Sequence, residues 1–157
     1  MLERGMWAEG EEARGFENEL GDYLGLRHVQ LVNSGSSANL AALSALATEY
    51  IPEDRRLLPG DEVITPALCF PTTVSPIVYS GAVPVFVDVE AGTWNINPKQ
   101  VEDMIGYKTK AVMVAHNLGN PFNLDEIAAI CRRWGLWLIE DNADALGAEW
   151  NGRKTIS

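Results

Sequence analysis

The stretch at residues 110–140, KAVMVAHNLGNPFNLDEIAAICRRWGLWLIE, decides the fold because two apolar runs in it flank one amphipathic segment. The runs at 110–116 and 136–140 are rich in aliphatic residues, which is typical of strands buried on both faces of a sheet. Between them, apolar residues recur at helical spacing after Asn123, a predicted N-cap. A strand, a helix and a strand in this order predict a parallel pair with a helical crossover.

The same alternation of strands and helices continues outward along the chain. Further strands are predicted at 28–32, 61–66 and 83–89, and further helices at 11–26, 36–50, 71–81 and 98–106. Gly25 is a predicted C-cap, and Asn97 is an N-cap followed by proline in the first helical position. Residues 151–157 contain no predicted helix or strand. We therefore expect an α/β fold with a mainly parallel sheet and helices on both faces.

Ligands of such sheets bind at the carboxyl ends of the strands, so the residues there are the candidate site. The segment NSGSSANL at 33–40 joins a predicted strand to a helix through small residues. Gly35 allows a tight turn, and free amides of Ser36 and Ser37 at the helix start would suit a phosphate. The alternative is an ordinary serine-rich N-cap. No lysine follows this turn, which excludes a Walker loop, and GxGxxG is absent.

Two further strand ends carry rings. Phe70 follows the strand at 61–66 and is either a core anchor or a flat face for a planar ligand. His116 ends the strand at 110–116, and a lone histidine there is more often a hydrogen-bonded structural residue than a ligand. The second histidine, His28, is not at metal-ligand spacing from it and is expected to be structural or exposed.

Three carboxylates follow the last apolar run, in LIEDNADALGAEW at 138–150: Glu140, Asp141 and Asp144. Buried charge is costly unless it is paired, so a cation is expected nearby. One interpretation is a magnesium site of a phosphotransfer enzyme. A protonated pyridine nitrogen fits the other features better, because one strand-end carboxylate keeps such a ring an electron sink. A phosphate cradle, an aromatic ring and a strand-end Asp, in this order, indicate a pyridoxal phosphate site.

The composition limits the partners and the cellular location that we expect for the protein. The 157 residues are 46% apolar, which is enough for one globular unit. A net charge of −10 and the lack of a basic stripe argue against nucleic acid as a partner. No apolar run reaches bilayer length and no secretory signal is present, so we expect no membrane partner and a cytoplasmic protein. Cys69 and Cys131 lack metal-type spacing. Both chain ends look unlike those of a complete protein, so we expect a fragment.

Five segments resemble the DegT/StrS-type nucleotide-sugar aminotransferase family of fold-type I, pyridoxal phosphate-dependent enzymes. They are VNSGSSANLAAL, PGDEVITPALCFPTT, GAVPVFVDVE with the following TWNINP, TKAVMVAHNLGNP and LIEDNADALGAEWNGRK. The resemblance implies that residues 1–157 are the N-terminal part of the cofactor-binding large domain. The motifs NSGSSAN, AHNLGNP and EDNADALG are most similar to the RfbH-type branch. Those CDP-4-keto-6-deoxy-D-glucose 3-dehydrases remove a C3 hydroxyl from a nucleotide-linked 4-keto sugar in lipopolysaccharide biosynthesis.

The resemblance also implies roles for individual residues. The backbone at 35–37 would hold the phosphate of pyridoxal or pyridoxamine 5'-phosphate, Phe70 would stack on the pyridine ring, and Asp141 would pair with the pyridinium nitrogen. Asp144 stands where aminotransferases of the family usually carry Gln or His beside the cofactor. This departure favours the dehydrase branch over transamination, which is the alternative.

The resemblance places the catalytic residue of the family beyond Ser157, as a His in dehydrases or a Lys in aminotransferases. None of the lysines present matches that position: Lys99, Lys108, Lys110 and Lys154. Ile156 replaces a glycine usual in the motif there. The small C-terminal domain would also lie outside this chain. Some dehydrases of this branch carry a 2Fe–2S cluster bound by cysteines in that later part of the sequence. The resemblance implies that the whole enzyme is a homodimer. It also implies that residues 1–157 by themselves are inactive. A noncatalytic cofactor or sugar-nucleotide binding module is the remaining alternative.

Overall fold

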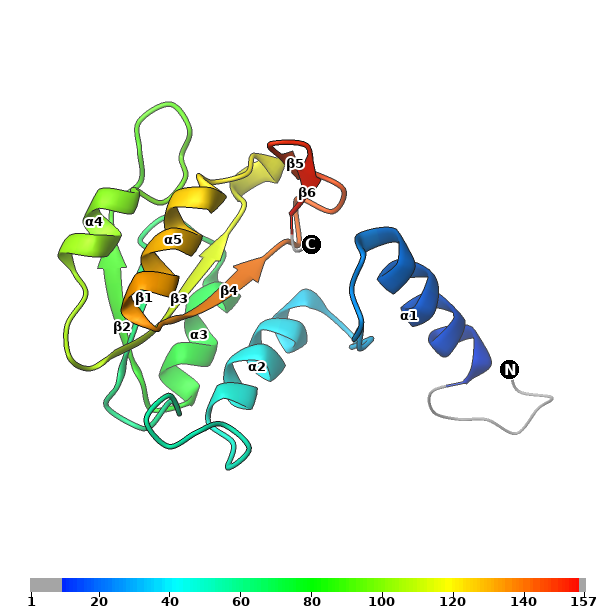
Figure 1. The fold of residues 1–157 in the computed structure, drawn as a ribbon, viewed down its shortest axis with the longest axis horizontal. Coiled ribbons are helices and arrows are strands. Elements are labelled where there is room, and N and C mark those ends of the chain that lie inside the picture. Colours follow the sequence, from blue (N-terminus) through cyan, green and yellow to red (C-terminus); the bar gives the residue numbers. More distant parts are fainter. Residues whose placement is uncertain (1–9, 156–157) are drawn as a thin grey trace.

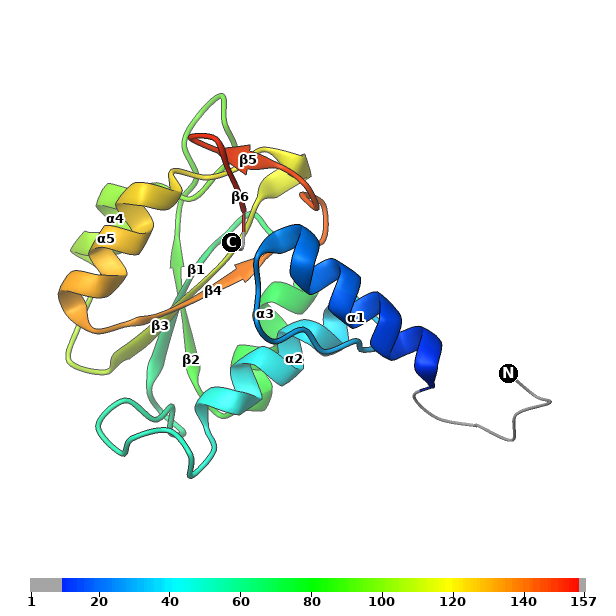
Figure 2. The same cartoon turned by 45° about the vertical axis from the view of Figure 1, so that its right-hand side comes forward.

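The computed structural model describes residues 10–155, in which strands and helices alternate along the chain (Figures 1 and 2). The elements are α1 (Glu11–Leu24), α2 (Gly35–Leu46), β1 (Glu62–Pro66), α3 (Pro71–Tyr79), β2 (Val83–Val87), α4 (Pro98–Asp103), β3 (Thr109–Ala115), the 3-10 turn η2 (Asn117–Gly119), α5 (Leu124–Trp134), β4 (Trp137–Asp141), β5 (Glu149–Trp150) and β6 (Arg153–Lys154). Across the described part of the chain, no helix combines the length and the apolar character that crossing a membrane requires.

The central sheet has the strand order β2-β1-β3-β4, and every neighbouring pair in it is parallel. The strands β3 and β4, which are joined by α5, pair from Ala111 opposite Trp137 to Ala115 opposite Asp141. This is the strand–helix–strand unit predicted from residues 110–140. All carboxyl ends of the sheet therefore meet at one edge, where β1 ends at Pro66 and β4 ends at Asp141.

Alternating side chains of the sheet supply two cores, one on each face. Val112 and Val114 of β3 pack in a cluster with Ile127 of α5. Ala111 and Met113 point to the other face, and their cluster contains residues of α2 and α3. Such alternation follows from the two-residue period of a strand. Figure 1 shows α4 and α5 on one side of the sheet and α2 and α3 on the other, which confirms the prediction of helices on both faces.

The helix ends follow the predicted capping chemistry. Asn97 Oδ1 accepts hydrogen bonds from the amides of Lys99, at 3.0 Å, and Gln100, at 3.3 Å, at the start of α4. Asn123 Oδ1 accepts from the amide of Glu126 at 3.2 Å at the start of α5. Gly25 ends α1 with a φ of 74°, a left-handed conformation that glycine adopts without strain.

Three predicted segments differ most from the structure. Residues 28–32 are not a strand: the amide of Leu31 donates to Glu17 Oε1 of α1 at 2.7 Å, so the backbone there is bonded to a side chain instead of a neighbouring strand. The segment 151–157, in which no strand was predicted, contains β6, which forms an antiparallel hairpin with β5. The helix predicted at 36–50 also ends earlier, at Leu46.

Candidate cofactor pocket

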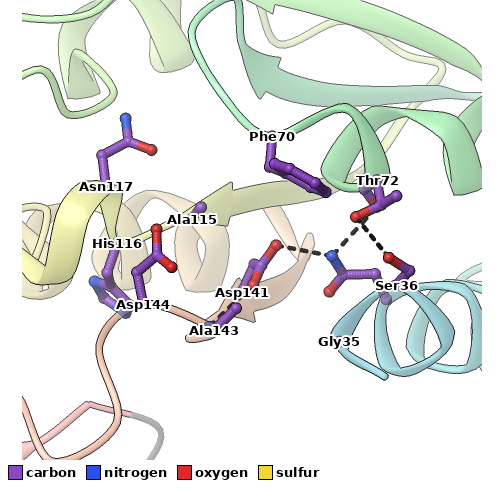
Figure 3. A pocket seen from close by; sticks show the side chains of 11 residues that line it. Gly35, Ser36, Phe70, Thr72, Ala115, His116, Asn117, Asp141, Ala143 and Asp144 are labelled. Carbon is purple, nitrogen blue, oxygen red and sulfur yellow. Dashed lines mark hydrogen bonds between the residues drawn. The ribbon is translucent and has the colours of Figure 1, made fainter. Parts of the chain in front are cut away.

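A pocket of about 270 Å³ lies at the carboxyl edge of the sheet, where the N-termini of α2 and α3 approach the ends of β3 and β4. This is close to the lower end, ~300 Å³, of small-molecule sites. Figure 3 shows the lining side chains. They are Gly35, Ser36, Asn39, Phe70, Thr72, Ala115, His116, Asn117, Asp141, Ala143 and Asp144. The structure thus brings together all of the predicted site residues except Ser37, which does not line the pocket.

Asp141 is the buried carboxylate of this pocket, with 9% of its surface exposed. Its Oδ2 accepts two hydrogen bonds, from Asn39 Nδ2 at 2.7 Å and from Thr73 Oγ1 at 2.9 Å. Its Oδ1 accepts one, from the amide of Ala143 at 3.2 Å. All of these donors are neutral, and within residues 10–155 no Lys, Arg or His forms an ion pair with Asp141.

The charge of Asp141 is also felt by the half-buried thiol of Cys69, which precedes Phe70. Burial raises the pKa of this thiol, and the negative charge of Asp141 raises it further, while a hydrogen bond with Thr65 offsets part of the increase. The environment of the carboxylate is therefore one in which additional negative charge is disfavoured and a cation is favoured.

The start of α2 forms the second wall of the pocket. Its N-cap, Ser34, accepts a hydrogen bond from the amide of Ser37 at 3.2 Å. The prediction that the Ser37 amide is free is therefore wrong. The amides of Gly35 and Ser36 have no acceptor among the described residues, as is usual in the first turn of a helix. Unpaired amides at the positive end of a helix dipole are the kind of groups that bind anions in proteins.

Phe70 is the N-cap residue of α3, and its ring remains 67% exposed. The alternative that it anchors the core is therefore wrong. Pro71 follows in the first turn of α3, where its restricted φ favours the helical conformation. Figure 3 shows the Phe70 ring and the Asp141 carboxylate facing the same space. A planar ligand lying on this ring would have its edge near Asp141.

His116 and Glu140 are hydrogen-bonded to each other. His116 is buried; its Nδ1 accepts from the amide of Phe122 at 3.3 Å, so its Nε2 carries the proton donated to Glu140 Oε2 at 3.2 Å. This confirms the structural interpretation of His116 and of Glu140. No group of three or more His, Cys, Asp or Glu side chains that could hold a metal occurs among residues 10–155. The three carboxylates at 140–144 therefore do not converge as a magnesium site requires.

Asp144 lies on the exposed loop after β4, next to the turn η2. A Cβ added to Gly119 of that turn would come 2.9 Å from the Asp144 carbonyl oxygen, and Gly119 has a φ of +79°. Both the close approach and the left-handed conformation require glycine here. The backbone of η2 therefore determines where the loop that carries Asp144 can run.

We expect Gly119→Ala to lower the free energy of unfolding by about 1–3 kcal/mol, because the Cβ adds backbone strain and a contact with the 141–144 loop. Chemical denaturation measures this change. Gly92→Ala is the matched control, since Gly92 has a φ of +94° but no atom within 4 Å of the added Cβ. Equal losses for the two variants would show that the contact with Asp144 is unimportant.

Asn39 and Thr73, the two side chains that hold Asp141 Oδ2, were not predicted from the sequence. A signal for Asn39 was present, because it stands four residues after Gly35 and therefore on the same face of the predicted helix. It is also the only amide side chain in the Ala- and Leu-rich segment 35–46. Thr73 carries no comparable signal, since a threonine in the first turn of a helix is common.

The fold and the pocket define a class of protein: a parallel sheet with an anion site, an aromatic ring and a buried carboxylate at its carboxyl edge. The structure matches the crystal structure of a GDP-4-keto-6-deoxymannose-3-dehydratase with a trapped PLP-glutamate geminal diamine. The TM-score is 0.87 at 35% identity, over 97% of this chain and 39% of that chain. The fold is therefore part of the α/β fold of fold-type I enzymes, as predicted.

The chain belongs to the DegT/DnrJ/EryC1/StrS aminotransferase family, whose sequence model matches residues 1–156. It is 54% identical over 148 residues to dTDP-4-dehydro-2,6-dideoxy-D-glucose 3-dehydratase of Saccharopolyspora spinosa, covering 94% of this chain and 32% of that protein. It is 51% identical over 138 residues to the lipopolysaccharide biosynthesis protein RfbH of Salmonella typhimurium, covering 88% of this chain and 31% of that protein. The chain thus spans about a third of the length of these relatives.

Proposed function

We propose that the pocket binds pyridoxal or pyridoxamine 5'-phosphate. In this proposal the phosphate lies at the start of α2, against the amides of Gly35 and Ser36 and next to Ser37, whose amide is bonded to the N-cap Ser34. The ring lies on Phe70, and its nitrogen points at Asp141. The observation that carries the proposal is the buried, ionisable Asp141, which has neutral donors only and no cation among the described residues.

The residues present fit this cofactor. A carboxylate oxygen has more than one lone pair, and Asp141 Oδ1 accepts a single hydrogen bond, so it can accept another from a pyridinium N–H. The helix start offers unpaired amides to a phosphate, and the exposed ring of Phe70 offers a face to a planar group. A phosphate, a ring and a nitrogen thus each meet a partner of matching chemistry.

For the whole protein, we propose C3 dehydration of a nucleotide-linked 4-keto-6-deoxy sugar in deoxysugar or lipopolysaccharide biosynthesis. The two relatives that are more than half identical over nearly the whole chain support this reaction, one being named a 3-dehydratase and the other a lipopolysaccharide biosynthesis protein. We further propose that residues 1–157 form part of the cofactor-binding domain. The catalytic base, a second domain and any 2Fe–2S cluster are expected in the remaining length of the protein.

When bound, the cofactor supplies the group that links to the sugar carbonyl and the ring that accepts electrons. The residues of this chain bind and orient that ring. Asp141 holds the proton on the ring nitrogen, which keeps the ring electron-withdrawing. The α2 amides hold the phosphate end, so the ring is attached at both ends. Asp144 lies beside the cofactor at the pocket rim, where a carboxylate replaces the Gln or His expected for transamination.

Sugar transamination is the second candidate function. A GDP-perosamine synthase of Caulobacter vibrioides is 37% identical to this chain over 142 residues. The deciding assay uses the full-length protein with pyridoxamine phosphate and a nucleotide-linked 4-keto-6-deoxy sugar. Loss of the C3 hydroxyl supports dehydration, and an amino group at C4 supports transamination. Cofactor binding with neither product would indicate a noncatalytic binding module, and no cofactor binding would overturn the proposal.

We also propose that the protein works as a cytoplasmic homodimer. A second, largely apolar pocket of about 390 Å³ adjoins the first and shares Phe70, Asn117 and Asp144 with it. Around it, Trp94 and Leu118 expose large apolar side chains. Apolar surface beside a polar site is typical of an interaction face. Light scattering on the full-length protein tests the dimer, and a monomer at micromolar concentration would contradict it.

We expect Phe70→Ala to weaken binding of pyridoxal 5'-phosphate about threefold to tenfold, because an aromatic contact contributes ~0.5–1.5 kcal/mol beyond its buried area. Absorbance titration of the cofactor measures the Kd. Phe86→Ala on β2 is the matched control, since Phe86 is 51% exposed and lies outside the pocket. Phe70 does not contact the ring if both variants bind as the wild type does.

A further inference from the structure

Asn39 is a buried amide in the second turn of α2, with 6% of its surface exposed. Its Nδ2 donates to Asp141 Oδ2 at 2.7 Å and to the carbonyl oxygen of Thr72 at 3.2 Å. These bonds join three elements, because Asn39 belongs to α2, Thr72 to α3 and Asp141 to the end of β4. A residue in a helix otherwise made of small and aliphatic side chains thus connects α2 to both α3 and β4 at the pocket.

We propose that Asn39 is a positioning residue that aims the Asp141 carboxylate at the ring nitrogen of the cofactor. This inference rests on the proposed function, because it assigns Asp141 as the partner of that nitrogen. Asn39 does not touch the cofactor in this proposal; it acts through Asp141. Thr73 assists by donating to the same oxygen.

The hydrogen bonds around Asp141 are divided unequally between its oxygens. Oδ2 accepts from Asn39 Nδ2 and Thr73 Oγ1, so its lone pairs are used inside the protein. Oδ1 accepts only from the amide of Ala143, at 3.2 Å. This arrangement sets the rotation of the carboxylate and leaves Oδ1 as the oxygen with an unused lone pair. Without Asn39, Oδ2 keeps only the Thr73 donor, so the rotation of the carboxylate is held by fewer hydrogen bonds.

The chemistry of the donors matters as much as their position. An amide and a hydroxyl orient a carboxylate without neutralising it, whereas an Arg or Lys would compete with the ring as the counter-charge. Because all the donors to Asp141 are neutral, its full negative charge remains for the cation that enters the pocket. Asn39 therefore orients the carboxylate without supplying a positive charge that would neutralise it.

Asn39 also links the ring end of the pocket to its phosphate end. Its bond to the Thr72 carbonyl is accompanied by a bond from Ser36 Oγ to Thr72 Oγ1 at 3.2 Å. Figure 3 shows these bonds side by side between the starts of α2 and α3. The distance between the anion site and Asp141 is thereby set by side chains that lie one helical turn apart.

The test compares pyridoxal 5'-phosphate with its carbocyclic analogue, in which CH replaces the ring nitrogen. The full-length protein is titrated with both ligands as wild type, Asn39→Leu, Asp141→Asn and the double variant. We expect Asn39→Leu to raise the Kd for pyridoxal 5'-phosphate about tenfold, as is typical when a hydrogen bond to a charged group is lost. The Kd for the analogue should change less than twofold. In the double variant, Asn39→Leu should add no further loss, because residues that act as one unit are not additive.

Thr73→Val provides a second variant in case Asn39→Leu does not fold, because it removes the other donor to Oδ2 and should show the same selectivity for the ring nitrogen. Thr109→Val is its control, a buried threonine at the opposite edge of the sheet. Equal weakening of both ligands by Asn39→Leu or Thr73→Val would reduce these residues to a structural role and overturn the inference. If Asp141→Asn itself fails to distinguish the two ligands, the proposed function is wrong instead.

Discussion

The Asp141→Asn variant is expected to bind pyridoxal 5'-phosphate about 150- to 5,000-fold more weakly than the wild type, because removing one partner of a buried ion pair costs ~3–5 kcal/mol. The carboxylate is the negative group buried in the pocket, and its neutral donors cannot replace it. Asn is close in shape to Asp, so the loss reports charge and not packing. The measurement is the Kd from absorbance titration of the full-length protein.

Asp88→Asn is the matched control for this experiment. Asp88 follows β2 at the same carboxyl edge of the sheet but does not line the pocket, so the variant removes one carboxylate charge at the end of the outer strand farthest from β4. It should change the Kd less than twofold. Wild-type affinity in Asp141→Asn would contradict the assignment of Asp141 as the counter-charge of the ring.

Phe122→Ala is expected to lower the free energy of unfolding by about 3–5 kcal/mol, the usual range for truncating a buried phenylalanine. Phe122 is 1% exposed and packs in the core between the sheet and α5. Its ring also stacks on His116, with the centroids 4.3 Å apart and the planes 5° apart. Truncation therefore leaves a cavity beside a buried imidazole whose orientation depends on that ring.

Chemical denaturation measures the Phe122→Ala loss, with Phe16→Ala on α1 as the control. Phe16 is 50% exposed, and a surface substitution of this kind changes stability by only ~0.5 kcal/mol. A loss below ~1 kcal/mol for Phe122→Ala would mean that the region around His116 collapses to fill the cavity. In that case the stacked pair is not a rigid support of the pocket floor.

The sheet and its crossovers were predictable because their signals are local. The alternation in β3 and the caps Asn97 and Asn123 are read from neighbouring residues, and the structure has each of them. The segment 28–32 has the composition of a strand, but a strand needs a neighbour, and Glu17 bonds its backbone instead. Propensity alone does not tell whether such a neighbour exists.

The candidate site also contains residues that the local sequence predicts and residues that it does not. The rule that ligands meet the carboxyl ends of strands led from sequence to Phe70 and Asp141, because both directly follow apolar runs. The partners of Asp141 were missed since hydrogen bonds between distant segments leave no mark on local pattern. Asn39 is 102 positions from Asp141 and Thr73 is 68 positions away.

These long sequence separations have a consequence for how the protein assembles. The pocket is closed by contacts that bridge most of the chain, and closing such large loops is slow because entropy is lost before the contacts form. The bond between Asn39 and Asp141 joins α2 to the last strand of the parallel sheet, so it depends on long-range contacts. Cofactor affinity should therefore appear as one of the last events of folding. A ligand that binds only the folded state shifts the folding equilibrium toward that state. Cofactor binding should therefore also stabilise the correctly folded protein.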